Sequence, residues 1–101
     1  MQCSHFDAGR CRSCTQLPQP YPQQLAAKQQ RARDALASWP ELDWLPAIDS
    51  AESGFRNKAK MVVSGSWRRP VLGILDADGK GVDLSDCALY SPGLQASFAT
   101  L

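Results

Sequence analysis

The sequence has no apolar run long enough to cross a bilayer. Its N-terminus also lacks the basic region followed by an apolar core that directs secretion. Its net charge is only +1 over 101 residues, so the whole molecule has no strong field to attract nucleic acid or a membrane surface. We therefore expect a cytoplasmic protein that binds no membrane and holds one small domain at most. Any electrostatic function must come from local clustering of charge.

Signatures of catalysis are also missing. No glycine-rich loop follows a predicted strand, and the single histidine and the scattered carboxylates form no nucleophile–base set. We therefore expect no catalytic residue in this chain. The histidine, His5, lies two residues from Cys3 and is a possible substitute metal ligand. A lone histidine of this kind is more often a bystander, and we leave it out of the predicted site.

Four cysteines are present, spaced C-x7-C-x2-C and then a single one after a further 72 residues. A C-x2-C pair holds two thiolates on one tight loop, where they can bind one metal ion or adjacent corners of a cluster. Because disulfides are rare in a reducing cytoplasm, the set indicates a metal site more than crosslinks. Soft thiolates select zinc, copper(I) or iron–sulfur clusters, and residue types alone do not choose among these. The predicted ligands are Cys3, Cys11, Cys14 and Cys87.

Two alternatives to a cluster site remain open at this point. A stand-alone zinc-stapled nucleic-acid-binding module would use the same thiolates, although a zinc ribbon or finger normally has a second short-spaced pair. A small secreted domain would instead pair the cysteines as disulfides. If Cys87 binds a metal, it pins the N-terminal arm to the rest of the domain. We would then expect loss of the metal to release residues 1–20.

The remaining sequence predicts an α+β fold with two parts, a cysteine-bearing arm over residues 1–20 and a domain over residues 21–101. Within the arm, Gly9 supplies a bend, and the proline-rich stretch 15–22 is expected to be extended. A helix with one apolar stripe is expected over residues 22–39, packed on a small antiparallel sheet of three to four strands. The predicted strands are 55–66, 71–77 and 81–85, with a weaker candidate at 44–48.

Turn and cap signals complete this fold. Asp78-Gly79 is a strong turn dipeptide between two predicted strands, and the segment Trp67–Arg69 is polar enough for another turn. Ser91 is placed to cap the start of a further helix near the C-terminal end of the chain. The fold therefore has few elements available to cover its sheet.

A basic segment runs from Gly54 to Pro70, with five basic residues and no acidic one. On the predicted strand, Arg56, Lys58 and Lys60 would share one face at intervals of about 7 Å. Such a row suits successive phosphates of a nucleic acid backbone, and Trp67 could stack on an unpaired base. The alternative is an edge strand whose lysines prevent aggregation. The charge pattern alone favours neither function.

Three stretches carry a family resemblance: the opening MQC…DAGRCRSC, the central GFRNKAKMVVSGS and the later DLSDCALY. In this order and spacing, they resemble the N-terminal part of the bacterial RumB-type 23S rRNA (uracil-C5)-methyltransferases. This family is a branch of the enzymes that use S-adenosylmethionine to methylate RNA uridines. The resemblance covers essentially the whole chain.

The resemblance implies a [4Fe–4S] cluster on Cys3, Cys11, Cys14 and Cys87. It also implies a central domain that helps to bind 23S rRNA through the stretch that begins at Phe55. The predicted RNA-binding residues are Phe55, Arg56, Asn57, Lys58 and Lys60. The domain that binds S-adenosylmethionine, the catalytic cysteine and the general base lie beyond this chain. We therefore expect an N-terminal fragment that is a monomer and is inactive alone.

Overall fold

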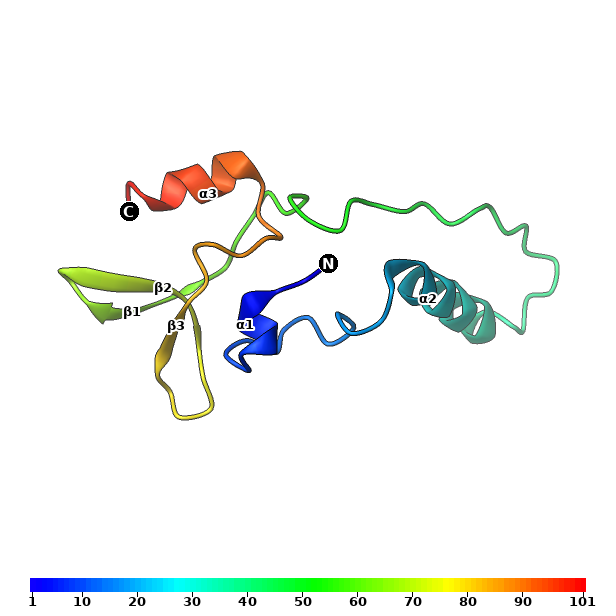
Figure 1. The fold of residues 1–101 in the computed structure, drawn as a ribbon. Helices are drawn as coiled ribbons and strands as arrows, with labels where there is room; N and C mark the ends of the chain where they lie inside the picture. Colours follow the sequence, from blue (N-terminus) through cyan, green and yellow to red (C-terminus); the bar gives the residue numbers. More distant parts are fainter. The chain divides into compact units, whose positions relative to one another are not determined.

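The computed structural model describes all 101 residues and has an α+β architecture with three helices and one three-stranded sheet, as the sequence predicts (Figure 1). The helices are α1 (Ser4–Asp7), α2 (Tyr21–Ala35) and α3 (Pro92–Phe98). The chain divides into two compact units. One joins Met1–Cys14 to Ala51–Leu101, and the other is Thr15–Ser50. The predicted cysteine ligands all belong to the first unit.

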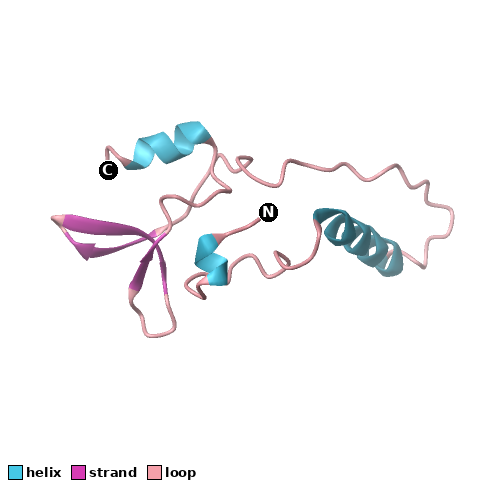
Figure 2. Cartoon of the chain, viewed as in Figure 1, coloured by secondary structure: helices cyan, strands magenta, loops and turns pink.

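The sheet is an antiparallel meander in the order β1-β2-β3, formed by β1 (Val62–Ser66), β2 (Arg69–Leu75) and β3 (Gly81–Asp83) (Figure 2). In β1 and β2, Val62 pairs with Gly73 and Ser66 pairs with Arg69, so the hairpin turns at Trp67 and Arg68. This confirms the predicted turn near the end of the basic segment.

The turn between β2 and β3 also forms as its dipeptide predicts. The carboxylate of Asp76 accepts hydrogen bonds from the amides of Asp78 and Lys80, at 3.0 and 2.8 Å. Gly79 follows with φ of +77°, a left-handed conformation that side chains disfavour. Local chemistry therefore sets this hairpin.

The first predicted strand is wrong over most of its length. Only Val62–Ser66 of the predicted 55–66 forms β1, and residues 57–61 belong to no helix or strand. The pairing of β1 with β2 begins at Val62 and Gly73, and β2 ends at Leu75, so a continued ladder would leave residues 56 and 58 without a partner. These residues therefore do not share one face of a strand.

The unit Thr15–Ser50 consists of α2 and the segments on either side of it. Pro22 lies in the first turn, as predicted, but the helix ends at Ala35 rather than at Trp39. Residues 15–18 form turns rather than an extended stretch. Residues 44–48 form no strand, because this segment has no neighbouring strand to pair with. Instead, the guanidinium of Arg33 lies 5.2 Å from the ring centre of Trp44.

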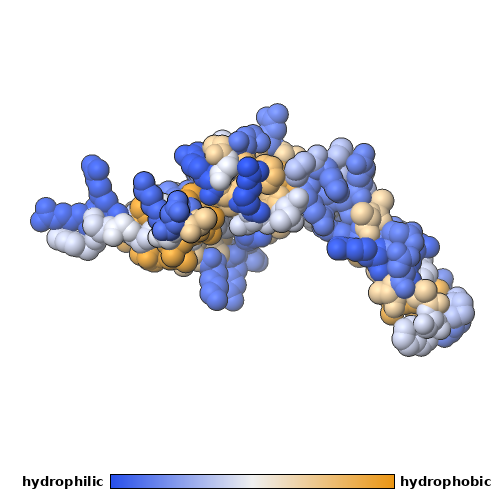
Figure 3. Space-filling model, turned by 90° about the horizontal axis from the view of Figure 1, so that it is seen from below, coloured by the Kyte–Doolittle hydropathy of each residue, from blue (hydrophilic) through white to orange (hydrophobic).

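The core of the first unit is small. Its buried hydrophobic residues are Leu84, Leu89 and Tyr90, all in or next to the segment that joins β3 to α3. The ring of Tyr90 meets that of Phe98 edge to face at 5.5 Å, which packs this segment against α3. Hydrophobic surface stays exposed over the part of the molecule that holds the sheet (Figure 3), with Val63 69% exposed. Hydrogen bonds and ion pairs between segments are therefore important for the stability of this unit.

The beginning of α3 confirms the predicted cap. The amide of Leu94 donates to the hydroxyl of Ser91 at 3.4 Å, and Pro92 occupies the first turn. None of the three helices combines the length and the apolar character needed to cross a membrane.

Candidate metal centre

Cys87 lies in a pair of tight turns between β3 and α3. Its amide donates to the carbonyl of Leu84 at 3.1 Å, and its own carbonyl accepts from the amide of Tyr90 at 3.1 Å. The side chain of Gln95 in α3 donates to the same carbonyl at 3.4 Å. Because Leu84 and Tyr90 are both core residues, the position of Cys87 is fixed by the packing on each side of it.

The other three cysteines lie in the arm, which folds back on itself around α1. Cys3 directly precedes this helix, and the carbonyl of His5 accepts from the amides of Arg10 and Cys11, at 2.9 and 3.1 Å. Gly9, with φ of +71°, makes the predicted bend. These bonds bring the C-x2-C pair back beside the start of the helix, so that Cys3 and Cys11 belong to one compact loop.

The other three thiols each act on the thiol of Cys14. All four are free and partly buried. Burial raises the pKa of the Cys14 thiol, and the charges of Cys87, Cys11 and Cys3 raise it further. Such charge effects between partly exposed groups act only over short distances. The other three thiols therefore lie within range of a charge effect on Cys14, although Cys87 is 73 positions distant in sequence.

The donor set fits a thiolate-bound soft metal or cluster. Four sulfur donors that repel one another as thiolates need a positive centre between them, and such a centre reverses the rise in pKa. No three side chains of histidine, cysteine, aspartate or glutamate lie close enough together to hold a single metal ion. The assignment of the four cysteines as ligands to a cluster remains a prediction.

A third segment of the same unit, residues 54–56, pairs with the chain that follows Cys87. The amide of Gly54 donates to the carbonyl of Ala88 at 2.9 Å, and the amide of Arg56 donates to that of Leu89 at 2.8 Å. Ser91 returns a bond of 2.9 Å to the carbonyl of Arg56, so that residues 54–56 run parallel to residues 88–91. The start of the basic segment is therefore fixed directly to the chain that follows Cys87.

The charge of Arg56 acts on one of the four cysteines, Cys14, and on Tyr90. It lowers the pKa of the Cys14 thiol and of the Tyr90 hydroxyl, opposing the larger effect of burial on each of them. A guanidinium in this position stabilises the thiolate form that a metal requires. The contact of Arg56 with RNA stays a prediction, and its charge acts in addition on the Cys14 thiol. The side chains of the other predicted RNA contacts, Phe55, Asn57, Lys58 and Lys60, are exposed.

The tip of the β1–β2 hairpin presents an aromatic ring and a cation together. Trp67 is 86% exposed, and the guanidinium of Arg68 lies 5.0 Å from its ring centre. This confirms that Trp67 lies in a turn beside basic residues, as the sequence indicates.

His5 lies next to the predicted ligands, although its sequence context did not place it in the predicted site. Its side chain is buried, and its Nε2 lies 2.6 Å from the carboxylate of Asp86, the neighbour of Cys87. The two residues are 81 positions apart, and nothing in their local sequence connects them. A lone histidine carries no periodic or motif signal, so only the fold reveals this contact.

Comparisons with known proteins agree with the resemblance in the sequence. No family model and no solved structure matches the chain. A curated protein of Enterobacter sp. (strain 638), named 23S rRNA (uracil(747)-C(5))-methyltransferase RlmC, is 52% identical over all 101 residues. The protein of the same name from Escherichia coli O139:H28 is 50% identical over the same length. The chain covers 27% of each relative, so it spans about a quarter of their length. Over its whole length, the chain is thus homologous to a segment of the 23S rRNA (uracil-C5)-methyltransferases.

Proposed function

We propose that this chain is the N-terminal part of an enzyme that transfers a methyl group from S-adenosylmethionine to C5 of a uridine in 23S rRNA. The observation that carries the proposal is the identity of 50–52% with enzymes of that name, without a break in coverage of this chain. The methyl donor would bind in another part of the enzyme, where the catalytic cysteine and the base would also lie. The chain alone is expected to be inactive. The whole enzyme is expected to be a monomer that works in the cytoplasm.

Within such an enzyme, the segment supplies a [4Fe–4S] site. The residues that would hold the cluster are Cys3, Cys11, Cys14 and Cys87. The charges of the other three thiols raise the pKa of Cys14, which supports this set because a cluster needs all four sulfurs on one small surface. Bound there, the cluster would tie the arm to the turn between β3 and α3, and the guanidinium of Arg56 would offset part of the negative charge of the thiolates.

The same segment supplies part of the RNA-binding surface. Lys58 and Lys60 are exposed in the stretch between the cysteine site and β1, and Arg68 and Arg69 lie at the hairpin tip. Basic side chains in this arrangement can follow a phosphate backbone, and Phe55 and Trp67, both more than half exposed, offer rings for base stacking. The surface is therefore suited to single-stranded or looped RNA, which is where base stacking on a protein is possible.

A chimeric enzyme tests this proposal. The corresponding quarter of the Escherichia coli relative is replaced by this chain, and methylation at C5 of 23S rRNA uridine is measured in cells that lack their own enzyme. We expect methylation to be restored, and the same chimera with Cys87→Ser to show much less. A chimera that is stably expressed and contains iron but does not methylate 23S rRNA would contradict the proposed function.

A further inference from the structure

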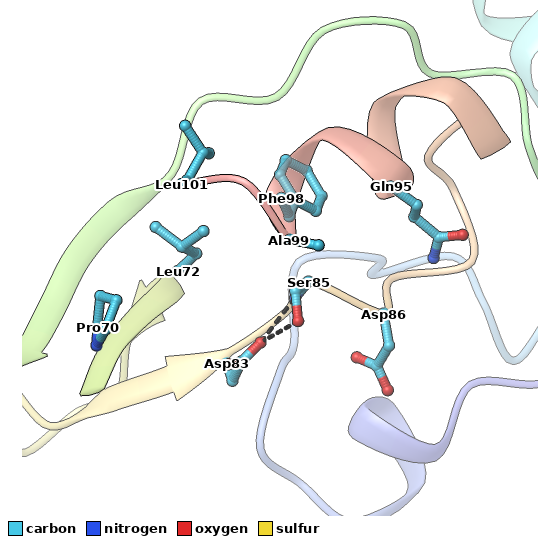
Figure 4. A pocket seen from close by; sticks show the side chains of 9 residues that line it. All are labelled: Pro70, Leu72, Asp83, Ser85, Asp86, Gln95, Phe98, Ala99 and Leu101. Carbon is cyan, nitrogen blue, oxygen red and sulfur yellow. Dashed lines mark hydrogen bonds between the residues drawn. The ribbon is translucent and has the colours of Figure 1, made fainter. Parts of the chain in front are cut away.

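The contact between His5 and Asp86 joins the two halves of the cysteine site. His5 lies in α1, two residues after Cys3, and Asp86 directly precedes Cys87. The distance between Nε2 and Oδ1 is 2.6 Å. Because a carboxylate accepts but does not donate, the ring nitrogen is the donor, whether the ring is neutral or charged. Figure 4 shows the Asp86 carboxylate pointing toward α1 from the rim of the groove beside α3.

The burial of His5 would be unfavourable without its contact to Asp86. The side chain is only 10% exposed, and its Nδ1 is buried with no hydrogen-bond partner. Burial of an unpaired ring nitrogen opposes folding, so an apolar side chain would fill the same space at lower cost. The single polar contact of the ring is the one to Asp86, and that contact offsets the cost.

The backbone of His5 organises the arm at the same time. Its carbonyl accepts from both Arg10 and Cys11, and so holds the loop that leads to the C-x2-C pair. One residue therefore fixes the fold of the arm through its backbone and the docking of the arm through its side chain. Asp83, which precedes Cys87 by four residues, has other hydrogen-bond partners than His5. It accepts from the amide and the hydroxyl of Ser85, at 2.8 and 2.6 Å, which leaves Asp86 as the carboxylate directed at the arm.

We propose that His5 is a positioning residue of the cysteine site, and that its hydrogen bond to Asp86 docks the arm onto the Cys87 turn independently of any metal. A cluster would then bind to an arm that is already docked beside the Cys87 turn, with less loss of chain entropy on binding. This inference rests on the proposed cluster for its consequence, although the docking itself involves polypeptide contacts alone. It differs from the expectation that only the metal holds the arm.

Limited proteolysis of the metal-free chain tests the docking. Arg10 and Arg12 lie in the loop that the carbonyl of His5 holds, so we expect trypsin to cut after them faster when the arm is released, and cleavage after Lys28 in α2 is the internal reference. We expect His5→Ala and Asp86→Ala each to speed cleavage in the arm by about tenfold relative to that reference, as the loss of one hydrogen bond with a charged partner allows. His5→Gln, whose amide can replace the Nε2 donor, should stay within about twofold of the unaltered chain. Asp7→Asn, an exposed carboxylate of the same helix, is the matched control and should have no effect.

The double variant separates a specific contact from general damage to the core. If the two residues act through one hydrogen bond, His5→Ala with Asp86→Ala cleaves no faster than either single variant. Rates that multiply in the double variant, or an Asp86→Ala rate equal to that of the unaltered chain, would overturn the proposal. Because the side chain of Asp86 is 72% exposed, Asp86→Ala should fold even if His5→Ala does not.

A separate experiment measures how the contact between His5 and Asp86 affects the stability of the cluster. After anaerobic reconstitution with iron and sulfide, we expect the His5→Ala chain to lose its visible absorption to a chelator about tenfold faster than the His5→Gln chain, because a released arm exposes three ligands at once. Equal rates for these two variants would contradict the positioning role. If the unaltered chain takes up no iron, the cluster proposal fails, while the proteolysis result still decides the docking.

Discussion

The backbone amide of Arg56 donates a 2.8 Å hydrogen bond to the carbonyl of Leu89, two residues after Cys87. This bond attaches the start of the basic segment to the cysteine site. It places a cation where it lowers the pKa of Cys14, against the combined effect of burial and of three other thiols. The segment predicted to contact RNA therefore begins beside the turn of Cys87, and the two proposed functions would meet at Arg56.

The first prediction concerns the charge of Arg56. Arg56→Ala should raise the pKa of the Cys14 thiol, so that its alkylation in the metal-free chain requires a higher pH. Trypsin cleavage after Arg12 separates Cys14 from Cys11, which allows mass spectrometry to follow Cys14 alone. Lys58→Ala removes a charge two residues away and is the control. The same pH midpoint for Arg56→Ala and for the unaltered chain would show that this guanidinium does not act on Cys14.

The second prediction concerns RNA. Substitution at Arg56 alters both sites, so the lysines are the cleaner test. The double variant Lys58→Ala with Lys60→Ala should bind a 23S rRNA stem-loop more weakly. Its salt dependence should fall by about 1.4 in slope, since each lost phosphate contact on single-stranded RNA accounts for about 0.7. Binding isotherms over a range of salt concentrations measure this slope.

A charge-matched control is available for the lysine experiment. Lys28→Ala with Lys80→Ala removes the same charge from α2 and from the β2–β3 turn, outside the basic segment. If both double variants change the slope equally, the lysines near the cysteine site have only a general electrostatic role and the assigned surface is wrong.

The third prediction concerns pH and the loop before Cys87. Hydrogen bonds from the hydroxyl and the amide of Ser85 lower the pKa of Asp83 below its ordinary value. Because the ionised form is the one bound in the fold, its contribution to stability is present above the pKa of the unfolded chain. This contribution is lost as the pH falls through the lowered, folded-state pKa. Ser85→Ala should raise the pKa of Asp83, as read from the pH titration of its carboxyl carbon by NMR.

Urea unfolding checks the same contact through stability. Asp83→Asn should lower the free energy of unfolding near neutral pH, and the difference from the unaltered chain should shrink in acid, where Asp83 itself becomes protonated. A difference that stays constant over the whole acidic range would mean that the charge of Asp83 plays no part.

Features that depend on neighbouring residues could be predicted from the sequence. The turn at Asp78-Gly79, the cap at Ser91 and the bend at Gly9 each follow from the conformational preferences of one or two residues. The four-cysteine set could be recognised because its spacing and its flanking motifs are unusual. These features required no knowledge of how distant segments meet.

Features that depend on partners distant in sequence could not be predicted. Alternation between Phe55 and Met61 is typical of a strand, but a strand needs a neighbour, and the pairing of β1 with β2 begins only at Val62. Residues 54–56 pair instead with residues 88–91, which no periodicity indicates. The contact between His5 and Asp86 also could not be predicted, because the local sequence around neither residue indicates the other.

Metal analysis decides whether the three cysteines of the arm and Cys87 form one iron–sulfur site. The chain is purified without oxygen, and its iron, zinc and acid-labile sulfide are measured for the unaltered protein and for Cys87→Ser. We expect close to four iron and four sulfide per chain in the unaltered protein, as a [4Fe–4S] cluster requires, and much less in the variant. A colourless protein that holds stoichiometric zinc and no sulfide would contradict the claim.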